Sequence, residues 1–338
     1  MRLVFFGSPE FAVPSLTALV SGGHEVELVV SQPAKPAGRH GELSDPAVAR
    51  LAKSLSLALF QPASLRPDDA VGRLAGPRAD LFVVAAYGKI LPQRVLDLPR
   101  LGAVNVHGSV LPRWRGASPV QAAILAGDDV TGVTIMKMDA GMDTGPVYAI
   151  EETGICEGEN AETLGSRLAE MGAELLVETL SFLEGKRADD QTNLSANVER
   201  SRPGSRWSSL SKRFFFPPVP QDGSQATYCP KITREDGLVD WALPAQSLVR
   251  RDRAFTPWPG LFTFRRKTRL KLSGLSLVAG EPPRAPPGTI LSVSPLLVVA
   301  CGEGAMAVRQ LQGEGRKRLD AAEFVRGERV APGEVWPS

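Results

Sequence analysis

The chain has 338 residues, of which 43% are hydrophobic and 22% charged. This composition is that of a globular protein and excludes a fibrous or wholly disordered chain, and the length exceeds what one hydrophobic core usually serves, so we expect two domains. The net formal charge is only +2, yet residues 227–338 carry 17 basic against 11 acidic residues, while residues 1–226 carry 22 against 26. The excess in the last third predicts a face for a polyanion, and a solvated basic surface without a partner is the alternative.

The cysteines and the apolar runs limit the cellular setting. Cys156, Cys229 and Cys301 are scattered, odd in number and without metal-ligand spacing, which indicates neither a disulfide framework nor a zinc site. No run approaches the roughly 20 apolar residues of a membrane span. We therefore expect a cytoplasmic protein with no bound metal and no membrane partner.

Residues 1–155 alternate short apolar runs with amphipathic stretches. The runs RLVFFG, HEVELVVS and DLFVVAAYG are separated by segments with helical patterning. This alternation predicts βαβ units and hence an α/β fold with a mostly parallel sheet. In FGSPEFA, Ser8 is expected to cap a helix that starts at Pro9, at the carboxyl end of the first strand.

The next segments continue the same domain. SPVQAAILAGD predicts a helix, and GVTIMKMD and GPVYAIEE predict strands. In residues 160–186 apolar side chains recur at helical spacing, which predicts a long helix that packs on the core and closes the domain at residue 186. These side chains are Leu164, Leu168, Met171, Leu175, Leu176 and Leu180.

Residues 187–217 break this pattern, because serine and arginine are abundant and apolar periodicity is lost. We interpret residues 187–226 as a linker with an unusually long insertion. The aromatic cluster at residues 214–216 is interpreted as local packing beneath the linker, with a docking patch as the less favoured alternative.

The segment from residue 227 predicts a small β-barrel or sandwich. One helix, PAQSLVRRDRAF, precedes short β-prone segments that are separated by Gly- and Pro-containing turns. CGEGAMA resembles a dinucleotide-binding fingerprint, but a β-prone run follows it where a helix would be needed. We therefore discount a dinucleotide site.

The segment NVHGSVLPRWRG carries the first candidate catalytic residues. Asn105 and His107 are two residues apart on an extended run, so both side chains project from one face at the end of a strand. In open α/β sheets that end is where ligands bind. A lone histidine can also be a hydrogen-bonded core residue, but the paired asparagine and the following Gly-Ser turn favour a functional role.

The segment MDAGMDTGPV is the second candidate. Asp139 and Asp143 alternate with Gly141 and Gly145, which are expected to let the backbone turn sharply and approach a ligand closely. A turn whose Asp side chains bond local amides is an equal alternative. An Asn, a His and a carboxylate without a Ser or Cys nucleophile predict direct acyl-type transfer, in which the amide stabilises an oxyanion, the imidazole moves a proton and the carboxylate holds the imidazole.

These motifs resemble the formyltetrahydrofolate-dependent formyltransferase family. The pattern NxH, SxLP and a downstream Asp is typical of the whole family, whereas PRWRGASP, MDAGMDTG, YCPKI and RAFTPWPG resemble the branch that acts on methionyl-tRNA. The resemblance covers almost the whole chain. It implies a Rossmann-like catalytic domain at residues 1–186 and an OB-like, tRNA-binding barrel at residues 227–338.

The resemblance also implies a reaction and its residues. The formyl group of the co-substrate 10-formyltetrahydrofolate would pass to the methionine amino group of initiator methionyl-tRNA, for translation initiation. Asn105, His107 and Asp143 would be the catalytic residues. The folate would lie against four consecutive residues, Ser109, Val110, Leu111 and Pro112. We expect a monomer.

The basic run RRKTRLK is the candidate tRNA contact. Alternating spacing would place Arg265, Lys267, Arg269 and Lys271 on one strand face as a phosphate track, and Arg39 would reach toward the acceptor stem. A charged edge strand protected from aggregation is the alternative.

Two other functions compete with this interpretation. A nucleotide-sugar formyltransferase would keep the catalytic residues but would not need a basic barrel. A non-catalytic folate- or RNA-binding module is the third reading, and the presence of Asn105, His107 and Asp143 argues against it.

Overall fold

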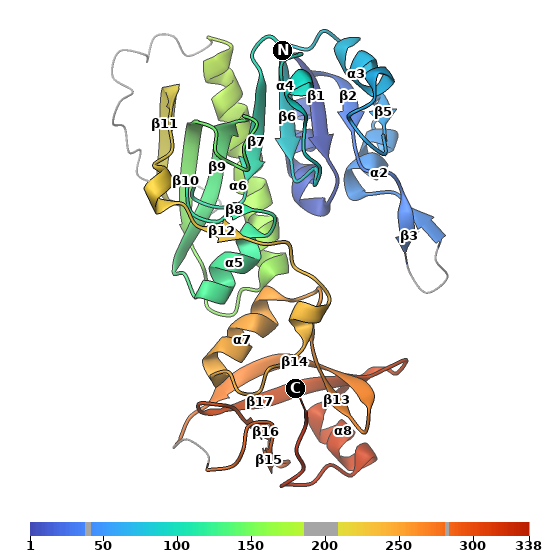
Figure 1. Cartoon of the computed structure of the whole chain (residues 1–338), viewed down its shortest axis with the longest axis vertical. Helices are drawn as coiled ribbons and strands as arrows, with labels where there is room; N and C mark the ends of the chain where they lie inside the picture. The colour runs from blue at the N-terminus through green and yellow to red at the C-terminus, as the bar shows by residue number, and fades with distance from the viewer. Residues whose placement is uncertain (38–41, 186–208, 281–283, 338) are drawn as a thin grey trace. The chain divides into compact units, whose positions relative to one another are not determined.

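The computed structural model describes residues 1–37, 42–185, 209–280 and 284–337, and each of its two units has its own sheet (Figure 1). Unit 1 comprises Met1–Pro119, Asp129–Ile155 and Leu164–Pro230. Unit 2 comprises Lys231–Ser338 together with Val120–Asp128 and Cys156–Thr163. The bounds at residues 186 and 227 stay predictions.

The sheet of unit 1 has the strand order β11-β10-β9-β7-β6-β1-β2-β5. Its strands are β1 (Arg2–Gly7), β2 (Glu25–Val30), β5 (Leu59–Phe60), β6 (Leu81–Ala85), β7 (Ala103–His107), β9 (Val130–Lys137), β10 (Val147–Gly154) and β11 (Ser209–Val219). The pairs from β7 to β5 are parallel, and β9, β10 and β11 add antiparallel pairs at the other side. The predicted mostly parallel α/β sheet is confirmed.

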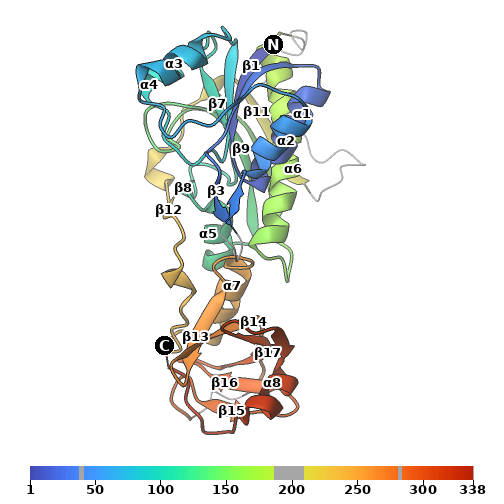
Figure 2. The ribbon, with the colours of Figure 1, turned by 90° about the vertical axis from the view of Figure 1, so that its right-hand side faces the viewer.

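Helices cover both faces of this sheet, with α1, α2 and α6 on one side and α3 and α4 on the other (Figure 2). These helices are α1 (Val13–Ser21), α2 (Ala47–Ser54), α3 (Asp68–Ala75), α4 (Gln93–Leu96) and α6 (Ala161–Leu183), whereas α5 (Pro119–Ala126) falls almost wholly within the residues of unit 2. The long helix predicted at residues 160–186 is confirmed as α6, and its six apolar residues at helical spacing are all buried. Among the helices of the described residues, none has both the length and the apolar character needed to cross a membrane.

Ser8 does not cap a helix, so that prediction is wrong. A 3-10 helix (Glu10–Ala12) leads into α1, and neither has a side-chain cap at its N-terminus. The Ser8 hydroxyl instead accepts a hydrogen bond from the Gln32 N–H at 3.1 Å and donates to the Tyr87 carbonyl oxygen at 3.4 Å. It thus joins the segments that follow β1, β2 and β6 at the carboxyl edge of the sheet.

The prediction that residues 187–226 form a linker is wrong at Ser209–Val219, which form strand β11. Strand β11 pairs antiparallel with β10 at the edge of the sheet. Phe214 and Phe216 pack on Phe182 of α6, with ring centroids 5.1 and 4.8 Å apart, which confirms local packing of the aromatic cluster. The long insertion itself, residues 187–208, lies outside the described residues.

Unit 2 is an antiparallel sheet that curls into a half-barrel (Figure 1), as the predicted small OB-like barrel requires. Its strands run in the order β13-β14-β17-β16-β15, with β18 also paired to β17. The elements are β13 (Leu261–Arg265), β14 (Thr268–Val278), β15 (Ile290–Ser292), β16 (Leu297–Ala300), β17 (Ala305–Gly313), β18 (Arg318–Asp320), α7 (Ala245–Ala254) and α8 (Ala321–Glu328). The sequence predicted α7 but missed α8. A strand, β17, and not a helix follows CGEG, as expected when the dinucleotide-binding fingerprint was discounted.

The basic run RRKTRLK does not form one strand face, so this prediction is wrong. Arg265 ends β13, Arg266 and Lys267 form the hairpin turn with positive φ angles of 50° and 65°, and only Arg269 and Lys271 share a face of β14. The Arg265 side chain, only 6% exposed, forms ion pairs with Glu334 at 2.6 Å and Glu328 at 3.2 Å.

Arg265 therefore stabilises unit 2. We expect Arg265→Met to lower the free energy of unfolding by roughly 2–4 kcal/mol, because Glu334 loses its cation and Glu328 keeps only the exposed Arg316, 2.9 Å away. Lys267→Met, in the exposed turn, is the control and should change it by less than about 0.5 kcal/mol. Urea denaturation of the full chain measures both values, and equal stabilities would contradict this role.

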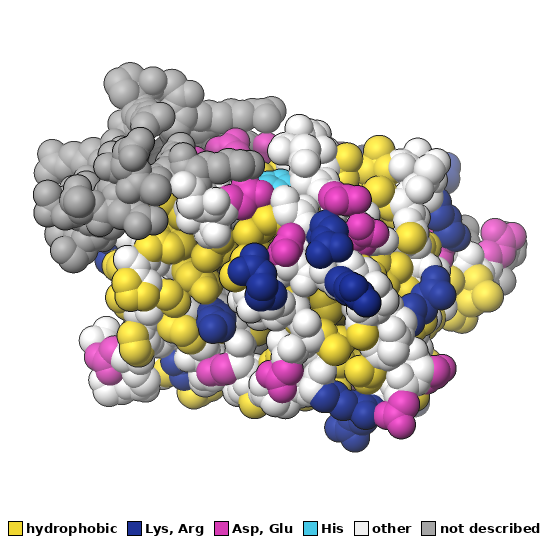
Figure 3. Space-filling model, turned by 90° about the horizontal axis from the view of Figure 1, so that it is seen from above, with side chains coloured by type: hydrophobic (Ala, Val, Ile, Leu, Met, Phe, Trp, Pro, Cys, Tyr) yellow, Lys and Arg dark blue, Asp and Glu magenta, His cyan; other side chains and the backbone are white. Residues whose placement is uncertain are grey.

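Charge is mixed on the face of unit 1 where the chain begins. Figure 3 shows basic side chains there interspersed with acidic, polar and apolar ones.

Across the described part of the chain, no group of three or more His, Cys, Asp or Glu side chains could hold a metal ion.

Candidate active site

Strand β7 places Asn105 and His107 at the carboxyl edge of the sheet of unit 1. It lies between β6 and β9, opposite Met136 and Thr134 of β9 in register. Alternation along the strand sends both side chains to the same face. Asn105 is half-buried, and the His107 side chain is 5% exposed.

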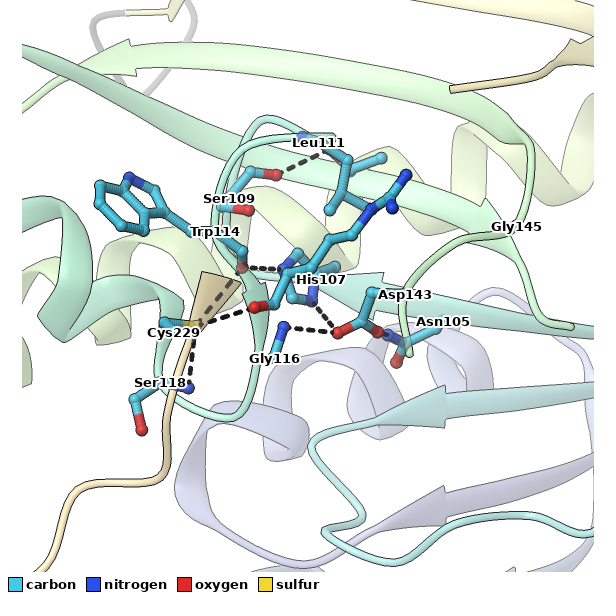
Figure 4. Close-up of polar contacts among 12 residues, drawn as sticks. Asn105, His107, Ser109, Leu111, Trp114, Gly116, Ser118, Asp143, Gly145 and Cys229 are labelled. Atoms are coloured by element: carbon cyan, nitrogen blue, oxygen red, sulfur yellow. Dashed lines mark hydrogen bonds and ion pairs between the residues drawn. The ribbon is translucent and has the colours of Figure 1, made fainter. Parts of the chain in front are cut away.

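The loop after β9 brings Asp143 to these two residues (Figure 4). One carboxylate oxygen, Oδ2, lies 3.8 Å from His107 Nδ1 and accepts the Gly116 N–H at 2.9 Å. The other, Oδ1, accepts a hydrogen bond from Asn105 Nδ2 at 3.5 Å. The structure thus brings together the three residues predicted to be catalytic.

The other nitrogen of His107 faces the backbone. Nε2 lies 3.0 Å from the carbonyl oxygen of Trp114, which can only accept a hydrogen bond, so the neutral ring carries its proton on Nε2. Trp114 is held in turn by the hydroxyl oxygen of Thr227, which accepts its N–H at 2.9 Å. A proton can then be gained or lost at Nδ1, beside Asp143, and the imidazolium can donate from both nitrogens.

The four residues predicted to line the folate form the loop after β7. The Ser109 hydroxyl donates to the Arg113 carbonyl at 2.6 Å, and Thr134 binds both the Ser109 carbonyl at 2.7 Å and the Leu111 N–H at 3.1 Å. The side chains of Ser109 and Leu111 are buried, while Val110 and Pro112 remain partly exposed. Their role toward folate stays a prediction.

Of the two aspartates in MDAGMDTGPV, Asp139 makes local turn contacts, whereas Asp143 lies beside His107. Asp139 accepts the Gly141 N–H at 3.0 Å and the Thr144 hydroxyl at 2.7 Å, which is the local turn role. The left-handed backbone of the turn falls on Asp143 itself, with φ of 53°. Gly145 is needed for close approach, because a Cβ there would lie 1.9 Å from the Lys137 carbonyl oxygen.

The segment after β11 supplies site residues that the sequence did not reveal. Its short strand β12 (Tyr228–Cys229) pairs parallel with β8 (Arg115–Gly116). The buried Cys229 thiol lies 3.4 Å from the Arg115 carbonyl oxygen and accepts the Ser118 N–H at 3.4 Å. Burial, and to a smaller degree the charge of Asp143, raises the pKa of this thiol.

The raised pKa predicts slow alkylation of Cys229. The thiolate is the reactive form, and raising the pKa lowers its fraction at any given pH. At pH 8 we expect iodoacetamide to modify the exposed Cys156 first and to spare Cys229 and Cys301, since burial raises the pKa of Cys301 to about 11. Mass spectrometry of the native protein measures the order, and equal rates at the three positions would contradict it.

Comparison with known proteins identifies the class. The family model "Formyl transferase" matches residues 1–180, and "Formyl transferase, C-terminal domain" matches residues 231–329. The fold, the site and these matches place the chain among the formyl transferases.

A methionyl-tRNA formyltransferase of Dechloromonas aromatica (strain RCB) is 43% identical over 335 residues, covering 99% of this chain and 98% of that protein. The counterpart of Gluconobacter oxydans (strain 621H) is 42% identical over 334 residues, covering 98% and 99%. The chain belongs to the methionyl-tRNA formyltransferase family.

Solved structures at low identity share the fold. HypX from Aquifex aeolicus in complex with tetrahydrofolic acid has a TM-score of 0.59 at 17% identity, and the match covers 96% of this chain but 47% of that one. WlaRD, a sugar 3N-formyl transferase, has a TM-score of 0.58 at 13% identity, with coverage of 94% and 99%.

Proposed function

We propose that this chain transfers the formyl group of 10-formyltetrahydrofolate to the methionine amino group of initiator methionyl-tRNA. The observation that carries the proposal is the convergence of Asn105, His107 and Asp143 at the carboxyl edge of the sheet, in a chain that aligns over its full length with methionyl-tRNA formyltransferases. The tetrahydrofolic acid in the HypX structure supports a folate donor.

The chemistry needs an oxyanion donor and a proton carrier. The methionine amino nitrogen attacks the formyl carbon, and the carbonyl oxygen becomes an oxyanion that the Asn105 amide can stabilise. His107 takes a proton from the attacking nitrogen and returns one to N10 of the folate as the C–N10 bond breaks. Asp143 holds the imidazole and complements its charge. The loop of Ser109, Val110, Leu111 and Pro112 would support the folate, with Val110 and Pro112 presenting the accessible side chains.

The basic surface around β14 is the proposed tRNA contact. Burial lowers the pKa of Lys271, and the neighbouring charges of Arg269, Arg234 and Arg318 lower it further, so these cations converge on one region of unit 2. Such mutual repulsion is relieved when a phosphate binds between them. Lys267 in the adjacent turn would extend the contact, and Arg39 lies outside the described residues.

Neutralising this surface should weaken tRNA use alone. We expect the triple variant Lys267→Gln, Arg269→Gln and Lys271→Gln to raise the KM for initiator methionyl-tRNA about tenfold or more and to reduce its salt dependence, because fewer counterions are released on binding. The KM for 10-formyltetrahydrofolate should stay within about twofold. Arg326→Gln, exposed on α8, is the matched control. Because β14 pairs with both β13 and β17, the charged edge strand is no longer an alternative, and an unchanged KM and salt slope would leave a solvated basic surface without a partner.

A comparison of acceptors tests the function. The likeness in fold to WlaRD favours a nucleotide amino sugar as the second candidate acceptor. With radiolabelled 10-formyltetrahydrofolate we expect transfer to initiator methionyl-tRNA and none to the amino sugar. Transfer to the sugar alone would overturn the proposal, and transfer to neither would favour a binding module.

A further inference from the structure

Gln221, two residues after β11, connects the turn at residues 143–145 to the segment Arg115–Gly116. Its amide nitrogen Nε2 donates to the carbonyl oxygens of Asp143 at 2.9 Å and Gly145 at 2.7 Å. Its oxygen Oε1 accepts from Arg115 Nε at 3.1 Å and Nη2 at 2.8 Å. Both donors and both acceptor positions of the side-chain amide are therefore used.

Both segments set the position of the Asp143 carboxylate: the turn carries the residue, and the Gly116 N–H binds Oδ2. The backbone of Asp143 is left-handed, a conformation that is unfavourable for a non-glycine residue and has to be enforced by neighbouring contacts. The Gln221 amide provides two such contacts on that turn. On the other side it binds the buried guanidinium of Arg115, the residue before Gly116, whose N–H binds Asp143 Oδ2.

We propose that Gln221 is a positioning residue for Asp143. By tying the turn at residues 143–145 to Arg115, it fixes the carboxylate between the Gly116 N–H and His107 Nδ1. This inference rests on the proposed function of the site, and it assigns a role to a residue 78 positions away from Asp143 in the chain. The essential property is the donor: a carboxylate at this position would keep Arg115 but would turn an acceptor toward two carbonyl oxygens.

Gln221→Glu tests the donor with little change in shape. We expect kcat for formyl transfer to fall about tenfold or more, while the KM values for both substrates stay within about twofold. The matched control is Gln225→Glu, because Gln225 is exposed on the same segment and its side-chain amide donates to Asp222 at 3.0 Å. It should keep kcat within about twofold.

A double-mutant cycle with Asp143→Asn separates positioning from a general structural defect. If Gln221 acts through the Asp143 carboxylate, Gln221→Glu should lower kcat by less than about twofold when combined with Asp143→Asn. The same tenfold loss in both backgrounds, or a wild-type kcat in Gln221→Glu alone, would overturn the proposal.

Crystal structures keep the two proposals apart. Formylation by the wild-type enzyme in the same assay tests the proposed function on its own. If it were absent, the structures of the wild type and of Gln221→Glu would still decide: a carboxylate of Asp143 that leaves the Gly116 N–H in the variant supports the positioning role, and an unmoved carboxylate overturns it.

Discussion

His107→Ala should lower kcat for formylation of initiator methionyl-tRNA about 100-fold or more, with the KM for 10-formyltetrahydrofolate within about twofold of wild type. The imidazole is the group placed to move a proton, with Nδ1 beside Asp143 and Nε2 fixed by the Trp114 carbonyl. Its removal takes away proton transfer but leaves the loop of residues 109–112 in place. Steady-state kinetics with both substrates varied measure the effect.

His24→Ala is the matched control for this variant. His24 precedes β2, and its Nδ1 lies 3.7 Å from Glu184 after the end of α6, away from the carboxyl edge of the sheet. The same change there should leave kcat within about twofold. Near-normal turnover by His107→Ala would refute the assignment of the site.

Asn105→Ala should lower kcat about 100-fold, because loss of a single oxyanion donor typically costs that much. The Asn105 amide lies at the end of β7 and is oriented by its 3.5 Å contact with Asp143 Oδ1. Asn160→Ala is the control: the Asn160 side chain accepts the N–H groups of Glu162 and Thr163 at the start of α6. Losing this cap should cost about 1 kcal/mol of stability without changing kcat. Equal kcat values in the two variants would exclude an oxyanion role for Asn105.

The central part of the fold and site could be predicted because it follows local periodicity. Apolar runs predicted the strands of the parallel sheet, and spacing of two along an extended run predicted that Asn105 and His107 share a face. Asp143 was assigned through the family resemblance. Gln221 had no such signal, because its partners are two backbone carbonyl oxygens and the side chain of Arg115, 106 positions earlier in the chain, which no local residue pattern brings together.

Strand β11 and Arg265 show a second limit. Polar residues of β11 are matched by charges that only the folded sheet brings near: Lys212 pairs with Glu151 and Glu178, each at 3.1 Å. The sequence pattern predicted that Arg265 is one of a row of exposed phosphate contacts. Its side chain is instead buried and forms ion pairs with two acidic residues more than sixty positions away in the chain. In both cases the partner that decides the role is distant in the chain.

A rapid-quench single-turnover experiment tests most directly whether Asn105 and His107 carry the chemical step. Enzyme in excess is loaded with radiolabelled 10-formyltetrahydrofolate and mixed with initiator methionyl-tRNA, so that formyl transfer is observed apart from product release. We expect His107→Ala and Asn105→Ala to bind both substrates as the wild type does and to transfer the label about 100-fold more slowly. Wild-type transfer rates in both variants would contradict this role of the site.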